Sequence, residues 1–168
     1  MIPLPRVADP DDLPAVHALL SAAGLSTTGL EDTWRIWVAG PDAQVLAAVA
    51  LERYPAPDLP GHAVCLLRSL VVDASARGRG WGAALVRTAL ATADAAVTQT
   101  PPAAGADGSG PAHPDERAVV ALLTETAAGY FDRFGFRPVG RADLPAELGA
   151  STQLRGVCCA SARVYLRG

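Results

Sequence analysis

The sequence predicts an α/β fold in which helices flank a mixed, mostly antiparallel sheet of six to seven strands. Three observations carry this prediction. Residues 65–90 combine an apolar strand, a glycine-rich turn and a helix. Before them, apolar segments 34–39 and 44–53 flank a Gly-Pro-Asp turn, which indicates a hairpin. After them, residues 117–124 form a nearly continuous apolar run, typical of a strand covered on both faces. Antiparallel strands mixed with crossover helices favour a layered α/β arrangement.

The N-terminal part should contain a short extended segment and one helix before the hairpin. Residues 3–7 are expected to be extended, and the acidic segment 9–12 supplies a cap and favourable charge for a following helix. That helix should end at Gly24. The remaining elements are a loop at 25–33, a proline-rich connection at 54–61 and a strand at 62–73.

The C-terminal part is expected to alternate short helices and strands after one long insertion. The helix that follows the glycine-rich turn should run to about Ala93. Residues 94–116, rich in proline, glycine and alanine, cannot bury a core and are expected to be a mobile insertion in a single domain of residues 1–168. A tolerated insertion is favoured over an active-site lid. The elements expected after it are a strand at 117–124, a helix at 127–134 that ends at Gly135, an extended segment at 137–140, a helical turn at 143–148 and a last strand at 158–166.

Composition limits the kinds of partner that this chain can have. Its 168 residues suit one globular domain, with 50% hydrophobic and 18% charged residues. The net charge of −3 leaves no broad basic face, which argues against nucleic acid as the main partner. The sequence shows neither a leader peptide nor an apolar run long enough to cross a membrane, so a cytoplasmic location is expected.

The cysteines and histidines do not form a pattern typical of a metal site or a catalytic triad. Three cysteines make no disulfide framework, and the adjacent pair Cys158 and Cys159 lacks the further ligands that zinc requires. We therefore expect no metal. The three histidines, His17, His62 and His113, are expected to be ordinary surface or packing residues.

The glycine-rich turn Arg77-Gly78-Arg79-Gly80-Trp81-Gly82 predicts an anion site. Its backbone N–H groups precede a helix and can surround a pyrophosphate. A Walker P-loop is excluded because that motif requires lysine and the chain has none. A dinucleotide turn is disfavoured, although the bare Gly-x-Gly-x-x-Ala pattern is present. Residues 73–77 separate the strand from the first glycine, and no acidic residue ends a second strand about 20 residues later.

Two segments resemble the signatures of the GNAT acyltransferases. Arg77-x-x-Gly80-x-Gly82 is similar to the Arg/Gln-x-x-Gly-x-Gly/Ala motif with which that family holds the pyrophosphate of acetyl-CoA. Residues 127–136 resemble the family's second signature, a helix that ends in Gly-Phe before a strand. The resemblance covers nearly the whole chain and is closest to the arsenic-resistance N-acetyltransferases. That subgroup usually has proline where Cys159 stands here.

The resemblance implies the GNAT acyl-CoA N-acyltransferase fold and acetyl-CoA as co-substrate. In such folds the pantetheine arm lies between two parallel strands that splay apart and pairs with the free edge of the first. A backbone N–H of Val71 or Val72 would polarise the thioester carbonyl. The implied cofactor-binding residues are Leu70, Val71, Val72, Arg77, Gly78, Arg79, Gly80, Trp81, Gly82, Ala83, Thr124 and Phe131.

The resemblance leaves the general acid open. Many relatives have tyrosine where this chain has Phe131, and the neighbouring Tyr130 should point elsewhere because adjacent helical residues do not share a face. Turnover is therefore expected not to depend on Tyr130. Ser161, on the last strand, is a candidate donor to the departing thiolate.

Glu52, Arg68, Ser69 and Glu125 are the candidates for the base and the acceptor site. Charged side chains within apolar strands are costly to bury without a partner, so one hypothesis is a structural Glu52–Arg68 ion pair. In the second hypothesis, Glu52 accepts the amine proton, directly or through water, and Arg68 binds a substrate carboxylate. Ser69 would face or flank the acceptor, and Glu125 could replace Glu52.

The implied activity is acetyl transfer from acetyl-CoA to the amine of a small, amino-acid-like acceptor, in a detoxification or resistance role. A peptide or protein N-terminal acetyltransferase is one alternative, and a non-catalytic domain that binds acyl-CoA is another. The partners expected are thus a small amine acceptor, no nucleic acid and no membrane, with the chain as a monomer or a homodimer.

Overall fold

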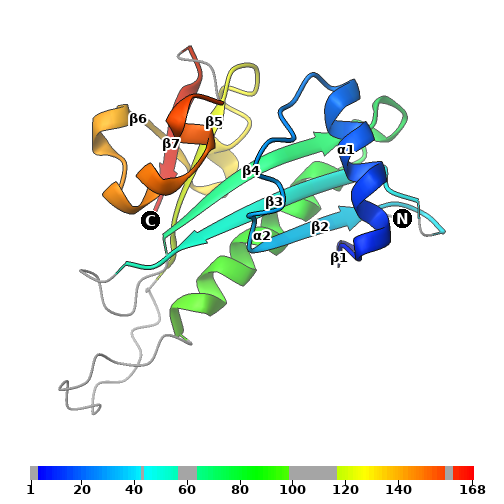
Figure 1. Cartoon of the computed structure of the whole chain (residues 1–168), viewed down its shortest axis with the longest axis horizontal. Helices are drawn as coiled ribbons and strands as arrows, with labels where there is room; N and C mark the ends of the chain where they lie inside the picture. Colours follow the sequence, from blue (N-terminus) through cyan, green and yellow to red (C-terminus); the bar gives the residue numbers. More distant parts are fainter. Residues whose placement is uncertain (1–3, 43, 57–63, 99–116, 158–160) are drawn as a thin grey trace.

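A seven-stranded sheet forms the centre of the protein, with strand order β1-β2-β3-β4-β5-β7-β6 (Figure 1). The computed structural model describes residues 4–42, 44–56, 64–98, 117–157 and 161–168. Every neighbouring pair of strands is antiparallel except β4 and β5, which are parallel. This confirms the predicted mixed, mostly antiparallel sheet. The strands are β1 (Arg6–Val7), β2 (Arg35–Ala39), β3 (Ala47–Tyr54), β4 (Val64–Val72), β5 (Val119–Thr124), β6 (Arg137–Val139) and β7 (Arg163–Arg167).

Two helices cover opposite faces of this sheet (Figure 1). Alternate residues of β3 point to the two faces, as the period of a strand requires. Val49 and Leu51 pack in one buried cluster with residues of α2 (Trp81–Thr98), and Ala48 and Ala50 pack in another with residues of α1 (Leu13–Ala22). Neither helix, nor any other in the described residues, is long and apolar enough to cross a membrane.

The parallel strands β4 and β5 separate towards their C-terminal ends. They pair from Val64 with Val119 to Leu67 with Leu122, and no further. β4 then continues to Val72 along β3, whereas β5 stays paired with β7 as far as Thr124. Among the described residues, the edge of β4 that faces β5 has no strand partner after Leu67. This is the splayed arrangement that the resemblance implied.

A β-bulge lies where β4 leaves β5. Val71 pairs with Ala48 and Arg68 pairs with Ala50, so that Ser69 and Leu70 together oppose the single residue between those two on β3. Ser69 adopts a φ of +57°, which is uncommon for a residue other than glycine. A bulge of this kind bends a strand and redirects its backbone groups. The bulge thus turns the free edge of β4 into the opening beside β5.

The helix after the glycine-rich turn is longer than expected. It runs to Thr98 and not to about Ala93, so the first five residues of the expected 94–116 insertion are helical. Asp94 explains part of this extension: its carboxylate accepts bonds from both terminal nitrogens of Arg167, at 3.0 and 2.9 Å, and from the Ala118 N–H at 3.0 Å. These contacts fix the end of α2 to β5 and β7. The rest of the insertion, 99–116, lies outside the described residues.

Several expected boundaries in the C-terminal part are wrong. Instead of a helix at 127–134 there is a turn followed by a 3₁₀ helix at Asp132–Phe134, because Gly129 adopts a φ of +80° that interrupts helical geometry. Helical turns occupy Arg141–Asp143, Ala146–Ala150 and Gln153–Val157, a longer set than the single turn expected at 143–148. The last strand begins at Arg163 and not at 158.

Candidate functional site

The glycine-rich turn is attached to the end of β4 by two side chains. Asp73 accepts hydrogen bonds from the Ser75 N–H at 2.9 Å and the Ser75 hydroxyl at 2.6 Å, which caps the 3₁₀ helix Ala74–Ala76. The same bonds from Ser75 lower the pKa of Asp73. The Nε of Arg77 donates to the Val72 carbonyl oxygen at 3.0 Å. The turn therefore has a defined position at the open end of β4.

The glycines of this turn expose the N-terminus of α2. Gly78 and Gly80 have φ values of +73° and +84°, a region that other residues rarely adopt. Gly80 accepts the first helical bond, from the Ala84 N–H at 3.0 Å. The N–H groups of the first turn of α2 have no partner within the helix, since none precedes them. Together with the positive end of the helix dipole, they make a suitable site for an anion.

Tyr130 borders the glycine-rich turn, whereas Phe131 is buried. The Tyr130 hydroxyl lies 3.0 Å from the position that a Cβ on Gly82 would occupy. Phe131 belongs to the core on the α2 face and packs edge-to-face against Phe136. The two neighbours point in different directions, but in the opposite sense to the one expected from the sequence, which placed Phe131 at the site and Tyr130 away from it. Tyr130, and not Phe131, presents its side chain to the turn.

Glu52 and Arg68 form a buried ion pair, which is the first of the two hypotheses drawn from the sequence. The Nη1 of Arg68 donates to Glu52 at 2.9 Å, and both side chains are almost fully buried. Arg68 also donates to the Thr28 and Gly29 carbonyl oxygens, at 2.8 and 3.2 Å, and to the Ser69 hydroxyl at 3.2 Å. The guanidinium thereby connects the α1–β2 loop to the sheet.

Two hydroxyls complete the coordination of the Glu52 carboxylate. Ser151 donates to it at 2.7 Å, and the Tyr54 hydroxyl makes a short bond to the same oxygen. Burial, together with that bond to Glu52, raises the pKa of Tyr54 to about 12, so Tyr54 remains a proton donor at neutral pH. Sequence reasoning missed both residues. Tyr54 stands two positions after Glu52 on the same face of β3, so the strand period could have indicated it. Ser151 lies 99 residues from Glu52, and no sequence pattern indicated it.

Glu52 also lines a cavity of about 200 Å³. The other lining residues come from the α1–β2 loop, the end of β3 and the β6–β7 connection, and they are Asp32, Arg53, Tyr54, Ala150 and Thr152. A small ligand in this cavity would contact Glu52 and Tyr54. Asp32 and Thr152 are further residues that sequence reasoning did not select.

Glu125 and Ser161 lie together but apart from the Glu52 network. The Ser161 hydroxyl donates to the Glu125 carboxylate at 2.8 Å, and both residues are exposed. They flank the ends of β5 and β7, where Thr124 pairs with Arg163. The Thr124 hydroxyl accepts from the Ala127 N–H at 3.1 Å and so holds the following turn. The candidate residues thus fall into three groups: the β4 edge with its turn, the Glu52–Arg68 pair, and the Glu125–Ser161 pair.

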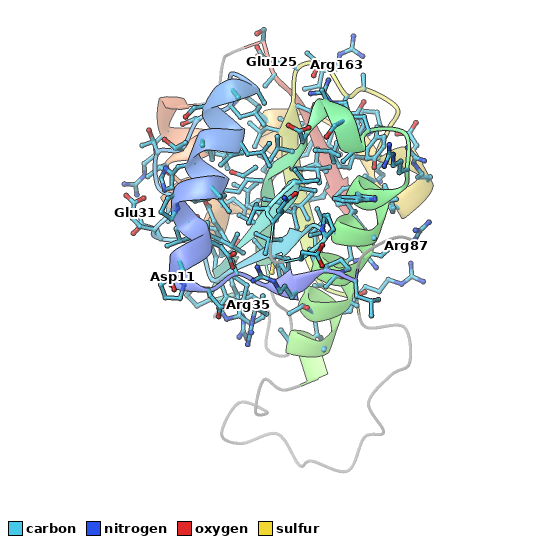
Figure 2. The ribbon with its side chains drawn as sticks, turned by 90° about the vertical axis from the view of Figure 1, so that its right-hand side faces the viewer. Asp11, Glu31, Arg35, Arg87, Glu125 and Arg163 are labelled. Carbon is cyan, nitrogen blue, oxygen red and sulfur yellow. The ribbon has the colours of Figure 1, made fainter. Side chains whose placement is uncertain are left out.

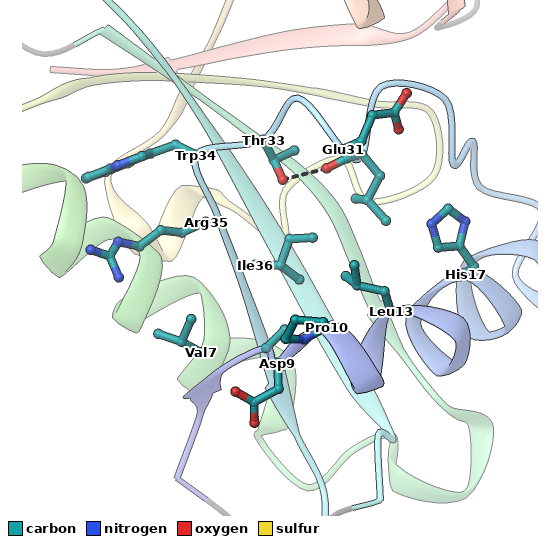
Figure 3. Close-up of a pocket in the computed structure, with 12 residues that line it drawn as sticks. Val7, Asp9, Pro10, Leu13, His17, Glu31, Thr33, Trp34, Arg35 and Ile36 are labelled. Carbon is teal, nitrogen blue, oxygen red and sulfur yellow. Dashed lines mark hydrogen bonds between the residues drawn. The ribbon is translucent and has the colours of Figure 1, made fainter.

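The remaining sequence candidates take no part in these groups. Cys65 is buried in β4, and burial raises the pKa of its thiol to about 12, which leaves it unreactive at neutral pH. His17 lines a second cavity, of about 360 Å³, between α1 and β2 (Figure 3). Cys158, Cys159, His62 and His113 lie outside the described residues.

Comparisons with known proteins support the same fold and name a family. Rv2747 from Mycobacterium tuberculosis, in complex with CoA and NLQ, superposes with a TM-score of 0.68 at 20% identity, over 98% of each chain. N-acetylglutamate synthase from Neisseria gonorrhoeae, in complex with coenzyme A and N-acetyl-glutamate, gives 0.67 at 17% identity, over 97% of this chain and 34% of that one. Naa50 from Arabidopsis thaliana, bound to the bisubstrate analogue CoA-Ac-MVNAL, gives 0.65 at 13% identity, over 98% and 97%.

These identities establish a shared fold and no more. A search of curated protein sequences finds no match. The family model described as the acetyltransferase (GNAT) domain matches residues 32–138, from the end of the α1–β2 loop into β6. Because this match spans more than half of the sequence and includes the splayed strands and the glycine-rich turn, the chain belongs to the GNAT family of acetyltransferases.

Proposed function

We propose that this protein transfers an acetyl group from acetyl-CoA to the amine of a small, amino-acid-like acceptor. The observation that carries the proposal is the free edge of β4, which runs from the bulge at Ser69 to the exposed N-terminus of α2. When bound, acetyl-CoA supplies the thioester that donates the acetyl group. The protein's residues then have to hold the co-substrate, position the amine and remove its proton.

The residues of the first group fit the co-substrate. The backbone of Leu70, Val71 and Val72 would pair with the pantetheine amides as a further strand would. An N–H of Val71 or Val72 would donate to the thioester carbonyl. The turn would hold the pyrophosphate through residues 77–83. Thr124 and Phe131 would support the cofactor site without contacting the cofactor. The Thr124 hydroxyl holds a turn, and the Phe131 ring fills the core.

Glu52 is our candidate for the residue that accepts the amine proton, because its carboxylate meets the cavity beside Tyr54. Glu52→Gln should lower kcat by about 100-fold or more, the range of a lost general base. The KM for acetyl-CoA should not change. Because the substitution also removes the partner of Arg68, the melting temperature must be measured in parallel. Unchanged kcat in a folded variant would assign Glu52 a purely structural role.

Tyr130→Phe should leave kcat within about twofold of the wild-type value, because the hydroxyl faces Gly82 and a CoA thiolate leaves without much assistance. Initial rates at saturating acetyl-CoA would measure this. A tenfold loss of kcat with intact folding would instead make Tyr130 a proton donor to the thiolate. Ser161 is the alternative donor, and Ser161→Ala tests it in the same assay.

The acceptor class rests on the resemblance to the arsenic-resistance N-acetyltransferases. Arg68, expected from the sequence to bind a substrate carboxylate, is almost fully buried and is already bonded to Glu52, Thr28, Gly29 and Ser69. Ser69 is proposed to flank the acceptor, whereas the exposed Glu125, also a candidate from the sequence, pairs with Ser161 in a separate group. CoA release should be assayed with phosphinothricin-like and methionine-sulfoximine-like amino acids, and then with a panel of peptide N-termini. Activity only on peptides would favour an N-terminal acetyltransferase. Binding of acetyl-CoA without transfer to any amine would favour a non-catalytic domain.

A further inference from the structure

Two arginine side chains lie close to one aromatic ring, Phe134. The guanidinium carbons of Arg87 and Arg133 lie 5.7 and 5.5 Å from the centroid of the Phe134 ring. Arg133 also lies 4.1 Å from the centroid of the Tyr130 ring, and its Nε donates to the Tyr130 carbonyl oxygen at 3.0 Å. Stacking on rings positions a guanidinium and leaves its N–H edges available for a ligand.

Neither arginine is neutralised by a carboxylate. Across the described ranges, ion pairs involve Arg6, Arg68 and Arg167, and both Arg87 and Arg133 are exposed. Arg87 lies on the outward side of α2 (Figure 2). Two neighbouring guanidiniums without a carboxylate partner make a local positive site in a chain whose net charge is −3. Two such groups suit a phosphate dianion, which each can bind through paired N–H bonds.

This positive site adjoins the glycine-rich turn. Tyr130, beneath Arg133, has its hydroxyl against Gly82 in the first turn of α2. Arg87 follows Gly82 by five residues, or about 7 Å along a helix. A ligand whose pyrophosphate occupied the N-terminus of α2 would therefore bring its neighbouring groups close to Arg87 and Arg133. Coenzyme A carries a phosphomonoester on the ribose next to its pyrophosphate.

We propose that Arg87 and Arg133, both close to the Phe134 ring, bind the ribose phosphomonoester of coenzyme A and make the enzyme selective for CoA over dephospho-CoA. The inference rests on the proposed acetyl-CoA site and adds a second anion subsite to it. Arg77, which donates to Val72, and Arg79 remain with the pyrophosphate. Tyr130 serves this subsite by supporting Arg133 through its ring.

The test compares two donors, acetyl-CoA and acetyl-dephospho-CoA, in wild-type protein and in Arg87→Gln and Arg133→Gln. Wild-type protein should show a KM about tenfold lower for acetyl-CoA. Each substitution should raise that KM several-fold and leave the KM for acetyl-dephospho-CoA and both kcat values unchanged. Arg35→Gln is the matched control. Arg35 is exposed at the start of β2, and its guanidinium carbon lies 5.4 Å from the centroid of the Trp34 ring.

Equal KM values for the two donors in wild-type protein, or substitutions that raise both KM values alike, would overturn the inference. Calorimetric binding of CoA and dephospho-CoA provides the same comparison without turnover. Tight and selective CoA binding in a protein that acetylates no amine would keep the phosphomonoester subsite and reject the proposed transferase activity. Absence of CoA binding would reject both.

Discussion

Gly80→Ala should raise the KM for acetyl-CoA about tenfold or more and leave kcat at saturating acetyl-CoA within about twofold. Gly80 has a φ of +84° and accepts the first hydrogen bond of α2. A Cβ at this φ costs about 1–2 kcal/mol, which the turn can relieve only by shifting its backbone. The shift would move the N–H groups that are proposed to hold the pyrophosphate. Initial rates over a range of acetyl-CoA concentrations would measure the effect.

Gly24→Ala is the matched control for Gly80→Ala. Gly24 follows α1 with a φ of +68°, and the space around its absent side chain is open. The same backbone strain should therefore lower the melting temperature of both variants by a similar amount. Only Gly80→Ala should change the KM. If both variants change it equally, or neither does, the turn does not hold the co-substrate.

Arg68→Met should destabilise the protein by about 3–5 kcal/mol, the usual cost of removing one member of a buried ion pair. The substitution leaves the Glu52 charge buried, with only Tyr54 and Ser151 as donors, and it releases the Thr28 and Gly29 carbonyl oxygens. In a chain of this length the melting temperature should fall by roughly 10 °C. Denaturant unfolding would give the free energy directly.

The double variant Glu52→Gln/Arg68→Met separates the charge from the packing. It removes both charges but keeps an oxygen that can accept from Tyr54 and Ser151. It should recover at least about half of the stability that Arg68→Met loses, since an unpaired buried charge is the larger part of the cost. A loss below about 1 kcal/mol in Arg68→Met alone would contradict the structural role of the pair.

Local sequence predicted those parts of the fold in which one segment determines its own structure. The strand, turn and helix of residues 65–90 follow from apolar periodicity and from glycines that few other residues can replace. The Glu52–Arg68 pair followed from two charges in neighbouring apolar strands. The end of α2 did not, because it depends on Asp94 and its partner Arg167, 73 residues away.

The acceptor side depended on contacts that no local pattern encodes. Arg68 is held by the carbonyl oxygens of Thr28 and Gly29, and every residue has such an oxygen whatever its side chain. Ser151, which completes the Glu52 site, belongs to a long connection of short helical turns. Gly129 interrupted an expected helix through its φ of +80°, a conformation that glycine permits but does not require.

Hydrogen–deuterium exchange with and without acetyl-CoA tests the central claim most directly, because it reports both binding and its location. Addition of acetyl-CoA should slow exchange in peptides that cover Leu70–Val72 and residues 78–83, with no change in α1 (Leu13–Ala22). The same protection should be lost in Gly80→Ala at equal acetyl-CoA concentration. Unchanged exchange at the β4 edge and the turn, or protection confined to other segments, would contradict the proposed site.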